Sequence, residues 1–490
     1  MLCSAKLNRN RRLIKIGNLS FTLITLTALL GLTILRKRHK TEPAPLGSHS
    51  FSTPTNITKS DIFVLSAYYF KEEKKIRLVG VARCDRLKKL FIKTGENVRQ
   101  ASIALMDQHC PWNWAPRCFW TGVFVDFPAA ITNEQHCKAR FSSQTDKFGS
   151  ETKMPLQVIG TGHQIKEHVL AVCVPPMFWY ADWIQLVQFI EAWTIYGATK
   201  FFFYIQSVLA EVERVIEIYE RDGLVSRVNF SNFHSAQVDG GMHTNGQIEA
   251  FNDCLIRSRQ HAKFVAFVDL DELMHFKTST LVQLLNNLSA KDSESAAFQF
   301  LSNTNHATQL NDWNAPRNAA QIKFSYMETV QREAYIFPAG AMSKIIAKPE
   351  MVELMNVHSV AKFRETTFTT FKVTPDQAAV VHLRKATHPD PQRQTLKLSA
   401  KPDEWLSPLA RRISTGWQAR LKRHYPNGLF LPNRALSVVE PLERCSYQLS
   451  RKRAQLCFAS GFYCSRAIVA NDWMETSFSW FQLKTDSTLM

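Results

Sequence analysis

The sequence predicts an α/β fold whose core is a mostly parallel sheet, and three observations lead to that class. Apolar strand-like runs alternate with amphipathic helical patterns three times from residue 168 onward. The strand-like runs are apolar at successive positions, as expected for strands that are covered on both faces. A fourth run, residues 264–268, leads directly into Asp269, Asp271 and Glu272. Carboxylates in that position are expected at the carboxyl edge of the sheet, where ligands of such folds bind.

The part of the chain before this alternation is predicted to be a β-rich module at residues 61–166. Strand-like runs at residues 62–70 and 76–81 are rich in β-branched and aromatic residues, which favour strands. A patch rich in tryptophan and cysteine follows at residues 110–118. A core braced by disulfides is the favoured interpretation of this patch, and a sugar-stacking surface is the alternative.

The main domain is expected at residues 167–435, and its elements follow from hydrophobic periodicity and from Gly and Pro signals. Gly197 is the expected C-cap of the first helix, and Ser207 is the expected N-cap of the second. Strand–helix units that are repeated in this way imply right-handed crossovers and a parallel sheet. The predicted strands are residues 169–174, 200–205, 224–230 and 264–268, and the helices between them begin near Trp183, Ser207 and Gln247.

Length and charge limit the classes of function. The chain has 490 residues, enough for one large domain and an accessory module. Its net charge is +18, from 60 Lys and Arg residues against 42 Asp and Glu residues. This charge is spread along the chain rather than gathered in one block. We therefore predict no nucleic-acid partner and expect a basic lumenal surface.

An apolar segment near the start predicts membrane attachment. Residues 16–35 carry no charge and are long enough to span a bilayer. Both flanks are basic, so charge alone does not orient the segment. No small-residue cleavage site follows, which favours an uncleaved signal-anchor over a removed signal peptide. We expect a cytosolic tail at residues 1–15 and a stem rich in Pro, Ser and Thr at residues 36–60.

Cysteine usage indicates an oxidising compartment. Nine of the ten cysteines follow the apolar segment, and most are clustered in loop-like sequence, as disulfides of secretory proteins are. None has the Cys-x-x-Cys spacing of a zinc site. Because nine is odd, at least one thiol is free or pairs between chains, and at least one of Cys173 and Cys254 is expected to be a plain core residue. Sequons at Asn56, Asn229 and Asn287 fit a glycosylated type II membrane protein.

The carboxylates after the fourth strand are the clearest chemical feature of the sequence. Asp269 and Asp271 share one face wherever the backbone stays extended, because side chains alternate along a strand. Two hard oxygen ligands in that place suit Mg²⁺ or Mn²⁺, with a diphosphate completing the coordination shell. A solvated acidic turn is the competing interpretation, since Asp-x-Asp is a short and common motif.

Motifs of several other enzyme classes are absent from the sequence. No Gly-x-Gly-x-x-Gly opens a helix, and no Gly-x-x-x-x-Gly-Lys-Ser/Thr occurs. The Gly-x-Ser-x-Gly motif of serine hydrolases is missing as well. Dinucleotide-binding, P-loop and serine-hydrolase functions are therefore disfavoured.

Short blocks of sequence over residues 168–385 follow one another in a specific order. They are Val172-Cys-Val-Pro-Pro-Met177, Phe189-Ile-Glu-Ala-Trp193, Gly197-Ala-Thr-Lys-Phe201, Asn252-Asp-Cys-Leu255, Asp269-Leu-Asp-Glu272, Lys344-Ile-Ile-Ala-Lys-Pro349, Val357-His358 and His382-Leu-Arg384. In order and spacing these blocks resemble the glycosyltransferase family 92 domain. One position departs from the family pattern, because Leu383 stands where the family usually has Tyr. That change affects packing or sugar contact more than metal chemistry.

The resemblance implies a GT-A fold and a nucleotide-sugar donor, which is UDP-galactose in the best-known members. It also implies a divalent cation (Mn²⁺ or Mg²⁺), inversion at the anomeric carbon, and a Golgi type II protein with a lumenal catalytic domain. The expected acceptor is a glycan on a glycoprotein or glycolipid. The resemblance covers the N-terminal module and the chain after about Arg420 less clearly, and residues 436–490 are expected to form a Cys-containing tail.

The resemblance and the chemistry of the residues together name a candidate site. A metal held by Asp271, with help from Asp269, offsets the charge that develops on the leaving diphosphate. His382 is preferred over His358 as a third protein ligand, and an arginine fork suits a diphosphate. The expected metal ligands are Asp269, Asp271, His382 and His358, and the expected donor-binding residues are Pro175, Asp253, Asp269, Lys344 and Arg384.

Inversion also needs a general base near the acceptor hydroxyl, and a carboxylate supplied after the Asp-x-Asp strand is expected. Asp312, Glu328 and Glu333 lie in the right region, and the sequence does not choose among them. Two other classes of function stay open. One is a catalytically silent, membrane-anchored carbohydrate-binding protein on the same fold. The other is a metal-dependent hydrolase or phosphotransferase of nucleotide substrates.

Overall fold

The computed structural model describes residues 61–87, 89–113, 115–129, 136–145, 148–160, 166–307, 317–385, 399, 401–468, 470 and 472–483. All of them belong to one compact unit, Phe51–Met490. Within these ranges no helix is both long and apolar enough to cross a membrane. The predicted cytosolic tail, membrane anchor and stem lie outside the described residues and stay predictions.

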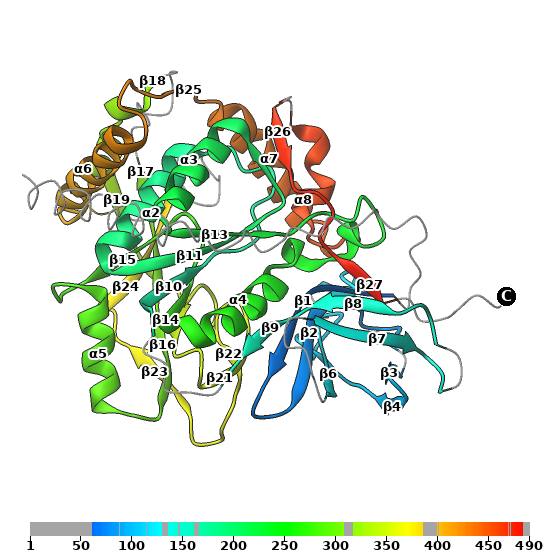
Figure 1. Cartoon of the computed structure of the whole chain (residues 1–490). Coiled ribbons are helices and arrows are strands. Elements are labelled where there is room, and N and C mark those ends of the chain that lie inside the picture. The colour runs from blue at the N-terminus through cyan, green and yellow to red at the C-terminus, as the bar shows by residue number, and fades with distance from the viewer. Residues whose placement is uncertain are drawn as a thin grey trace, which may run out of the picture. The chain divides into compact units, whose positions relative to one another are not determined.

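The centre of the fold is a seven-stranded sheet with the order β13-β11-β10-β14-β20-β16-β23 (Figure 1). Its first four strands are parallel neighbours, and by chain order they are the third, second, first and fourth strands of this sheet. The order reverses at β10, which makes the place between β10 and β14 a switch point, where ligands of open α/β sheets bind. The predicted mostly parallel sheet is therefore confirmed. The strands are β10 (His168–Cys173), β11 (Ala198–Ile205), β13 (Val225–Asn229), β14 (Ala262–Phe267), β16 (Ser295–Phe300), β20 (Lys344–Ala347) and β23 (Thr369–Val373).

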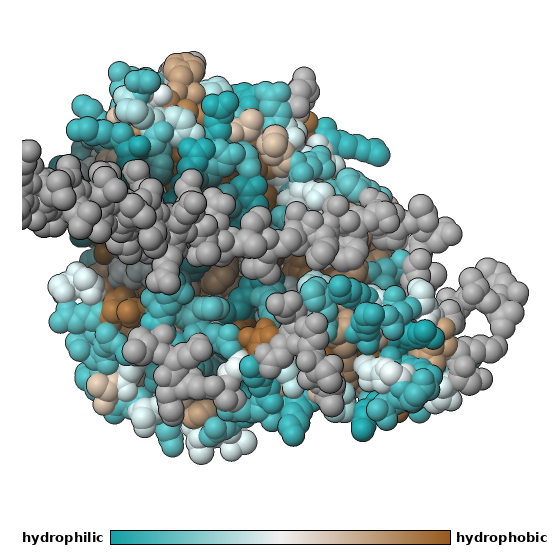
Figure 2. Space-filling model, viewed as in Figure 1, coloured by the Kyte–Doolittle hydropathy of each residue, from teal (hydrophilic) through white to brown (hydrophobic). Residues whose placement is uncertain are grey.

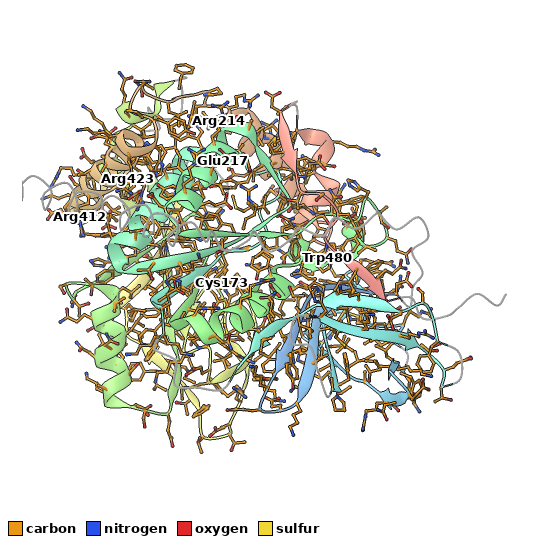
Figure 3. The ribbon with its side chains drawn as sticks, in the orientation of Figure 1. Cys173, Arg214, Glu217, Arg412, Arg423 and Trp480 are labelled. Atoms are coloured by element: carbon orange, nitrogen blue, oxygen red, sulfur yellow. A yellow bond between two sulfur atoms is a disulfide. The ribbon has the colours of Figure 1, made fainter. Side chains whose placement is uncertain are left out.

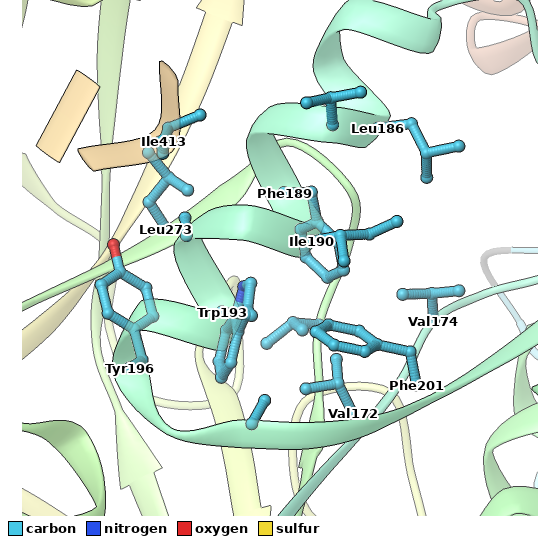
Figure 4. Close-up of a cluster of buried hydrophobic side chains, with 14 of the residues drawn as sticks. Val172, Val174, Leu186, Phe189, Ile190, Trp193, Tyr196, Phe201, Leu273 and Ile413 are labelled. Atoms are coloured by element: carbon cyan, nitrogen blue, oxygen red, sulfur yellow. The ribbon is translucent and has the colours of Figure 1, made fainter. Parts of the chain in front are cut away.

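Helices cover both faces of this sheet. The face of the molecule shown in Figure 2 carries mainly hydrophilic residues. Because strand side chains alternate, Val172 and Val174 pack toward α2 and α3, whereas Ala171 and Cys173 pack toward α4. Figure 3 shows Cys173 at the centre of the ribbon, and Figure 4 shows the α2 layer around Trp193. Each fully buried large side chain of these layers contributes about 1.5–3 kcal/mol. The helices are α2 (Trp183–Tyr196), α3 (Ala210–Arg221), α4 (Gln247–His261) and α5 (Leu281–Lys291).

The helix ends test the capping predictions. Gly197 follows α2 in the left-handed conformation of a C-cap, with φ of 108°. The Ser207 N-cap prediction is wrong, because Ser207 belongs to the short strand β12 (Ser207–Leu209). Its hydroxyl accepts a hydrogen bond from the Trp179 backbone N–H (2.8 Å) instead. Helix α3 then begins directly after β12 without a side-chain cap.

A second sheet of four strands leaves the first sheet at the Asp-x-Asp turn, in the order β15-β24-β17-β19. Its register places Glu272 opposite His382, and His382 opposite Thr304. Residues directly opposite one another on neighbouring strands share a face of the sheet. The second sheet can therefore carry a row of side chains that begins at the edge of the first sheet and runs across its own strands. Its strands are β15 (Glu272–Phe276), β17 (Ser302–Ala307), β19 (Val330–Ile336) and β24 (Ala378–Lys385).

The N-terminal module is β-rich, as predicted, and it packs on α4. It consists of a six-stranded sheet, β27-β1-β2-β6-β5 with β9 beside β1, and a four-stranded sheet, β4-β3-β7-β8. Tyr68, Val79 and Phe124 of the module form one buried cluster with Ile248 and Ile256 of α4. Its own strands are β1 (Ile62–Phe70), β2 (Lys75–Arg83), β3 (Phe91–Thr94), β4 (Asn97–Gln100), β5 (Ser102–Leu105), β6 (Trp120–Pro128), β7 (His136–Ser142), β8 (Thr152–Pro155) and β9 (Gln157–Ile159).

The C-terminal segment is built into both parts of the fold rather than appended as a tail. Strand β26 (Trp473–Glu475) pairs with β12 of the main domain, and β27 (Phe481–Leu483) pairs with β1 of the N-terminal module. Trp480, labelled in Figure 3, donates its indole N–H to the Ser231 carbonyl (2.8 Å). The remaining elements are β18 (Arg317–Asn318), β21 (Val352–Met355), β22 (Val360–Phe363), α6 (Leu406–His424), β25 (Phe430–Leu431), α7 (Ala435–Ser450) and α8 (Ser460–Tyr463).

Disulfides tie these segments together. Within the described residues the pairs are Cys84–Cys110, Cys118–Cys457, Cys173–Cys254 and Cys445–Cys464. The patch at residues 110–118 is thus braced by disulfides, and Cys137 is a free, buried thiol. The expectation of a plain core residue at Cys173 or Cys254 is wrong, because the two buried cysteines are bonded to each other. Disulfides persist in oxidising compartments, so this is a domain of the secretory pathway.

A buried acid lies between α4 and the N-terminal module. Glu249 is 1% exposed and packs so closely on β6 that a Cβ added to Gly122 would lie 3.0 Å from its Cγ. Its Oε2 has no hydrogen-bond partner within the described part of the chain. Burial raises the pKa of Glu249 to about 8, and the nearby Asp107 adds to the rise. The folded protein therefore holds this carboxyl group protonated at neutral pH.

We predict that Glu249→Gln stabilises the protein at alkaline pH. The pKa of Glu249 is higher in the folded than in the unfolded chain, so its contribution to the free energy of unfolding falls as the pH rises from about 5 to about 8. The amide removes this dependence, and we expect a gain of at least about 1 kcal/mol at alkaline pH by urea denaturation. Glu96→Gln, at a side chain that is 96% exposed, is the matched control and should change nothing. A loss of stability in Glu249→Gln at alkaline pH would contradict the raised pKa of Glu249.

Candidate active site

The Asp-x-Asp motif lies at the carboxyl edge of β14, beside the switch point. After β14, the Val268 N–H still donates to the Cys173 carbonyl of β10 (3.2 Å). A tight turn follows, in which the Glu272 N–H donates to the Asp269 carbonyl (3.1 Å) and the Asp269 N–H donates to the Glu272 carboxylate (2.9 Å). Because the backbone turns here, Asp269 and Asp271 meet different partners, which the assumption of an extended backbone did not anticipate.

Asp271 faces a histidine from β24. Oδ2 of Asp271 lies 2.7 Å from Nε2 of His382, a residue that is only 4% exposed. Burial alone would raise the pKa of Asp271, but His382, Arg384 and Lys344 hold it well below its usual range. Nδ1 of His382 is buried and has no hydrogen-bond partner among the described residues. The fold thus brings two of the predicted metal ligands into direct contact.

Asp269 is bound by a buried lysine rather than by a histidine. The Lys344 ammonium lies 2.5 Å from Oδ2 of Asp269 and 3.1 Å from the Glu272 carboxylate. Burial disfavours the charged lysine, but these two carboxylates keep the pKa of Lys344 above its ordinary value. Burial raises the pKa of Glu272 to about 7, and the charge of Lys344 opposes that rise. Lys344 is therefore the internal counter-ion of the turn, a different position from the diphosphate contact expected from the sequence.

The second sheet extends the site along one face. Arg384 lies opposite His306 in the β17–β24 ladder, and His382, two residues before Arg384, shares their face. The Arg384 Nε is buried and has no hydrogen-bond partner among the described residues. Nε2 of His306 contacts the carboxylate of Glu333 on β19, which is 4% exposed. A guanidinium and a second carboxylate–imidazole pair thus follow the first pair along the sheet.

Of the three predicted bases, Glu333 lies in this row. Glu328 is exposed on a short helical turn, Ser325–Thr329, where the Ser407 hydroxyl of α6 donates to it (3.4 Å). Asp312 lies outside the described residues. The geometry therefore supports Glu333 among the described base candidates.

Two further predicted residues lie near the cluster. Pro175 follows β10, and the ladder between β10 and β14 brings it to the same edge as Asp269. His358 donates its Nδ1–H to the Ser343 carbonyl (3.0 Å), next to Lys344 in the chain. Burial lowers the pKa of His358, and the charge of Lys344 lowers it further. His358 is thus a neutral ring at the rim, while His382 is the histidine that meets the motif.

Asp253 does not belong to this cluster. It lies within α4 with 0% exposure, and its carboxylate accepts from the hydroxyls of Tyr68 and Tyr204, each at 2.6 Å. Arg257, one helical turn later, donates to the same carboxylate at 2.6 Å. Internal donors from the N-terminal module, β11 and α4 engage this carboxylate, which favours a structural role for Asp253 over the predicted contact with the donor.

A cavity of about 360 Å³ opens at the same edge, beyond the ends of β11 and β13. Aromatic rings line it together with amide, hydroxyl and carboxyl groups, and no Lys or Arg is among the described residues of its wall. Trp179 forms part of the wall with a left-handed backbone (φ 48°), held by Ser207 and by an indole hydrogen bond to the Gly461 carbonyl (2.7 Å). Strained backbone of this kind clusters at functional sites.

The cavity is connected to the Asp-x-Asp turn through the start of α4. Asn245 lines the cavity, and its Oδ1 accepts from the Gly461 N–H (2.9 Å). Two residues later, Nε2 of Gln247 lies 3.4 Å from Oδ1 of Asp269. Neighbouring residues at the start of α4 therefore contact the cavity wall and the acidic turn.

Comparison with known proteins identifies the domain. The family model described as Glycosyltransferase family 92 matches residues 168–413, half of the chain. This chain belongs to glycosyltransferase family 92. The matched segment contains β10 to β24, so it includes the Asp-x-Asp turn, Lys344, His382 and Arg384 of the cluster described above.

Three curated family 92 proteins of Caenorhabditis elegans are similar to this chain. F13G3.3 is 26% identical over 133 residues, which are 26% of each chain. ZK381.2 is 22% identical over 198 residues, 38% of this chain and 37% of the relative. F59C6.8 is 24% identical over 267 residues, 51% of this chain and 48% of the relative. The chain thus spans about half or less of the length of the curated relatives that it matches.

Two solved structures are similar only weakly. S. aureus TarS 1-349 is 11% identical, with a TM-score of 0.21 and coverage of 37% of this chain and 48% of that chain. A mycobacterial protein is 12% identical, with a TM-score of 0.24 and coverage of 52% of this chain and 74% of that chain. Neither likeness carries a conclusion about this family 92 chain.

The resemblance to family 92 implies a divalent cation, and the residues present fit one in part. Asp271 and His382 offer a carboxylate oxygen and an imidazole nitrogen 2.7 Å apart, donor types that suit Mn²⁺. Asp269 is engaged by Lys344. No group of three potential ligands converges within the described part of the chain. These residues fit a cation that takes two protein ligands and completes its shell from the substrate.

Part of the site lies beyond the family 92 match and was missed in the sequence. Phe462, Ser465 and Glu475 line the cavity, although the match ends at residue 413. The available signal was the two cysteines Cys457 and Cys464, which lie on either side of Phe462 and are bonded to Cys118 and Cys445. Without the disulfide connectivity, nothing in the sequence indicates that this stretch returns to the sheet edge.

We predict that Asp253 is a structural residue of this family 92 domain. Removing the carboxylate leaves Arg257 buried without its charge partner, which costs about 3–5 kcal/mol. Asp253→Ala should therefore lower the urea midpoint strongly. The milder Asp253→Asn, where folded, should bind UDP as tightly as wild type in calorimetry. Arg384→Ala is the contrasting variant and should weaken UDP binding at nearly unchanged stability. Weakened UDP binding by folded Asp253→Asn would restore the donor-binding role.

Proposed function

We propose that this chain transfers a sugar, galactose in the first instance, from a UDP-sugar to a glycan hydroxyl, with inversion at the anomeric carbon and on a GT-A fold. The observation that carries the proposal is the cluster of Asp271, His382 and Arg384 at the carboxyl edge, inside the segment that matches family 92. The strand order of the sheet supports the fold, because nucleotides bind at the switch point of such sheets.

In this proposal the nucleoside of the donor occupies the 360 Å³ cavity, and the diphosphate points from it toward the acidic turn. Aromatic faces with amide and hydroxyl groups suit a base and a ribose. The described cavity wall carries no lysine or arginine, which favours an uncharged ligand part there. Positive charge for the diphosphate would come from Arg384 and from a metal ion held by the Asp271–His382 pair, both further along the edge.

Asp271 and His382 are the proposed ligands of Mn²⁺ or Mg²⁺. When bound, the cation would neutralise charge on the leaving diphosphate. Arg384 adds a fixed positive charge with a buried N–H at Nε that has no partner among the described residues and can donate to a phosphate oxygen. Lys344 neutralises Asp269 and thereby keeps the turn in the shape that directs Asp271 to His382.

Glu333 is the proposed general base. The acceptor oxygen bonds to the anomeric carbon while the bond from that carbon to the diphosphate breaks, and the hydroxyl proton passes to the Glu333 carboxylate. His306 contacts this carboxylate and orients it. Sheet β15-β24-β17-β19 and the cavity segment with α8 and β26 lie on different sides of β14 in Figure 1. Attack from the side of Glu333 and departure toward the cavity would then be opposed, as inversion requires.

We also propose that the domain works in the Golgi lumen, held by residues 16–35 as a type II anchor. The four disulfides support a lumenal setting. The uncharged length of residues 16–35 supports the anchor. Addition of an N-linked glycan at Asn287, which is exposed on α5, would be a further mark of passage through this pathway.

We predict that Asp271→Ala lowers the rate of sugar transfer at least about 100-fold while the protein stays folded. The Asp271 side chain is 26% exposed, so its removal takes away a site charge without opening the core. The measurement incubates the purified full chain with a panel of nucleotide sugars and glycans, with Mn²⁺ or with a chelator, and records transfer beside a thermal melt.

Asp376→Ala, at an exposed loop before β24, is the matched control and should keep the wild-type rate. Undiminished transfer by folded Asp271→Ala would rule out the metal role of this residue. Absence of any turnover by wild type across the panel would favour the silent carbohydrate-binding protein. Release of phosphate from nucleotides without a glycan would favour the hydrolase.

We predict that Ser465→Trp abolishes nucleotide binding by filling the cavity. Ser465 lines the cavity, and its hydroxyl donates to the Phe462 carbonyl within its own turn (2.8 Å). We expect the affinity for UDP, measured by calorimetry, to fall at least about 10-fold, or about 1.4 kcal/mol. Ser450→Trp, at the C-terminal end of α7, is the control and should bind normally. Normal UDP binding by Ser465→Trp would place the nucleoside elsewhere.

A further inference from the structure

The edge strand of the second sheet exposes aromatic and apolar residues directly after the proposed base. Tyr335 of β19 is 54% exposed, and Ile336 is 44% exposed. The rings of Tyr335 and Phe337 meet edge to face, with their centroids 5.1 Å apart. Exposed apolar side chains that are neighbours along a strand commonly mark a binding surface. The proposed reaction does not yet use them.

Tyr335 lies on the same face of β19 as Glu333. Arg332 donates to Asp403 on one face of the strand (2.9 Å), whereas Glu333 contacts His306 on the other. The β17–β19 ladder has a register shift here, because β19 advances four residues between the pairs Asn305–Arg332 and Asn303–Ile336 while β17 advances two. Asn303 and Asn305 are two residues apart on β17, so Ile336 returns to the face of Arg332, and Tyr335 next to it lies on the face of Glu333. The exposed ring therefore continues the row that begins at the Asp271–His382 pair.

The spacing along this row matches one sugar ring. Two residues span at most about 7 Å even in a fully extended strand, so the Tyr335 backbone lies within about that distance of the Glu333 backbone along β19. A pyranose has a face of C–H groups that is apolar and a rim of hydroxyl groups that is polar. Such a ring can pack its apolar face on an aromatic side chain while a rim hydroxyl points along the strand.

We propose that Tyr335, supported by Phe337, is the platform on which the acceptor glycan stacks, so that a hydroxyl of the stacked sugar reaches Glu333. This inference rests on the proposed transferase function and names the acceptor side of that same site. The acceptor class is a neutral pyranose, because the exposed end of β19, residues 334–336, is Ala-Tyr-Ile and carries no charged side chain. The platform selects for a sugar with an accessible C–H face.

A second copy of the chain is a less suitable occupant of this surface. Stable protein–protein interfaces bury about 1,200–2,000 Å² in total. The exposed apolar side chains here are those of one short strand, Val330–Ile336, whose first half has backbone bonds from Ser399 and Asp403. One tyrosine ring matches the size of one sugar, and its place beside Glu333 gives a sugar there a reactive neighbour.

The test compares Tyr335→Ala with Tyr335→Phe in the full chain. We expect Tyr335→Ala to raise the acceptor KM at least about 10-fold, while the KM for the UDP-sugar and the slow hydrolysis of donor without acceptor stay unchanged. Tyr335→Phe keeps the ring and should keep the acceptor KM of wild type. Tyr447→Ala, at another tyrosine that is 47% exposed, on α7, is the matched control and should behave as wild type.

Direct binding separates the platform from the reaction. Methyl glycosides of galactose, N-acetylglucosamine, mannose and fucose are probed by saturation-transfer NMR with wild type and Tyr335→Ala. Loss of the signal in Tyr335→Ala for a glycoside that wild type binds supports the platform even where no transfer is seen, which would count against the proposed function alone. The proposal would be overturned by an unchanged acceptor KM or an unchanged NMR signal in Tyr335→Ala. It would also be overturned if Tyr335→Ala only converted a dimer to a monomer in light scattering, without either change.

Discussion

One buried ammonium group, that of Lys344, holds the turn on which the site is built. Asp269 and Glu272 lie within 2.5 Å and 3.1 Å of it. Asp269 lies in the connection between the main sheet and the second sheet, and Glu272 is the first residue of β15. Two carboxylates this close would repel each other or take up a proton without a counter-charge. Lys344 supplies that charge from the antiparallel strand β20. With the turn held in this way, Asp271 is presented to His382 on β24.

A second buried ion pair joins the parts of the chain that surround the site. Asp253 of α4 accepts hydrogen bonds from Tyr68 of the N-terminal module, Tyr204 of β11 and Arg257. The same region is bridged by Cys173–Cys254, and Cys118–Cys457 brings the C-terminal segment to the N-terminal module. Breaking a buried pair of this kind costs several kcal/mol, so the hub fixes α4 against its neighbours. The cavity wall depends on that fixed position, since Met242 and Asn245, just before α4, line the cavity.

Local order could be predicted from the sequence because it depends on neighbours in the chain. The alternating strands and helices, the range of α4 and the left-handed Gly197 all follow from periodicity and backbone preference. Ser207 shows the limit of that approach. Its residue type suits an N-cap, but a backbone N–H from another loop, at Trp179, claims its hydroxyl. The Asp-x-Asp motif was visible too, while its turned backbone and the role of Glu272 were not.

The sequence by itself determined which chemistry is available: a parallel sheet that ends in carboxylates, histidines and an arginine late in the domain, and cysteines suited to an oxidising lumen. Only the tertiary structure decided which of these groups meet. His382 reaches Asp271 across 111 positions of sequence, Lys344 reaches Asp269 across 75, and Asp253 is claimed by Tyr68 across 185. Local propensity carries no information over such separations, because the partners are chosen by strand order and by the packing of buried charge.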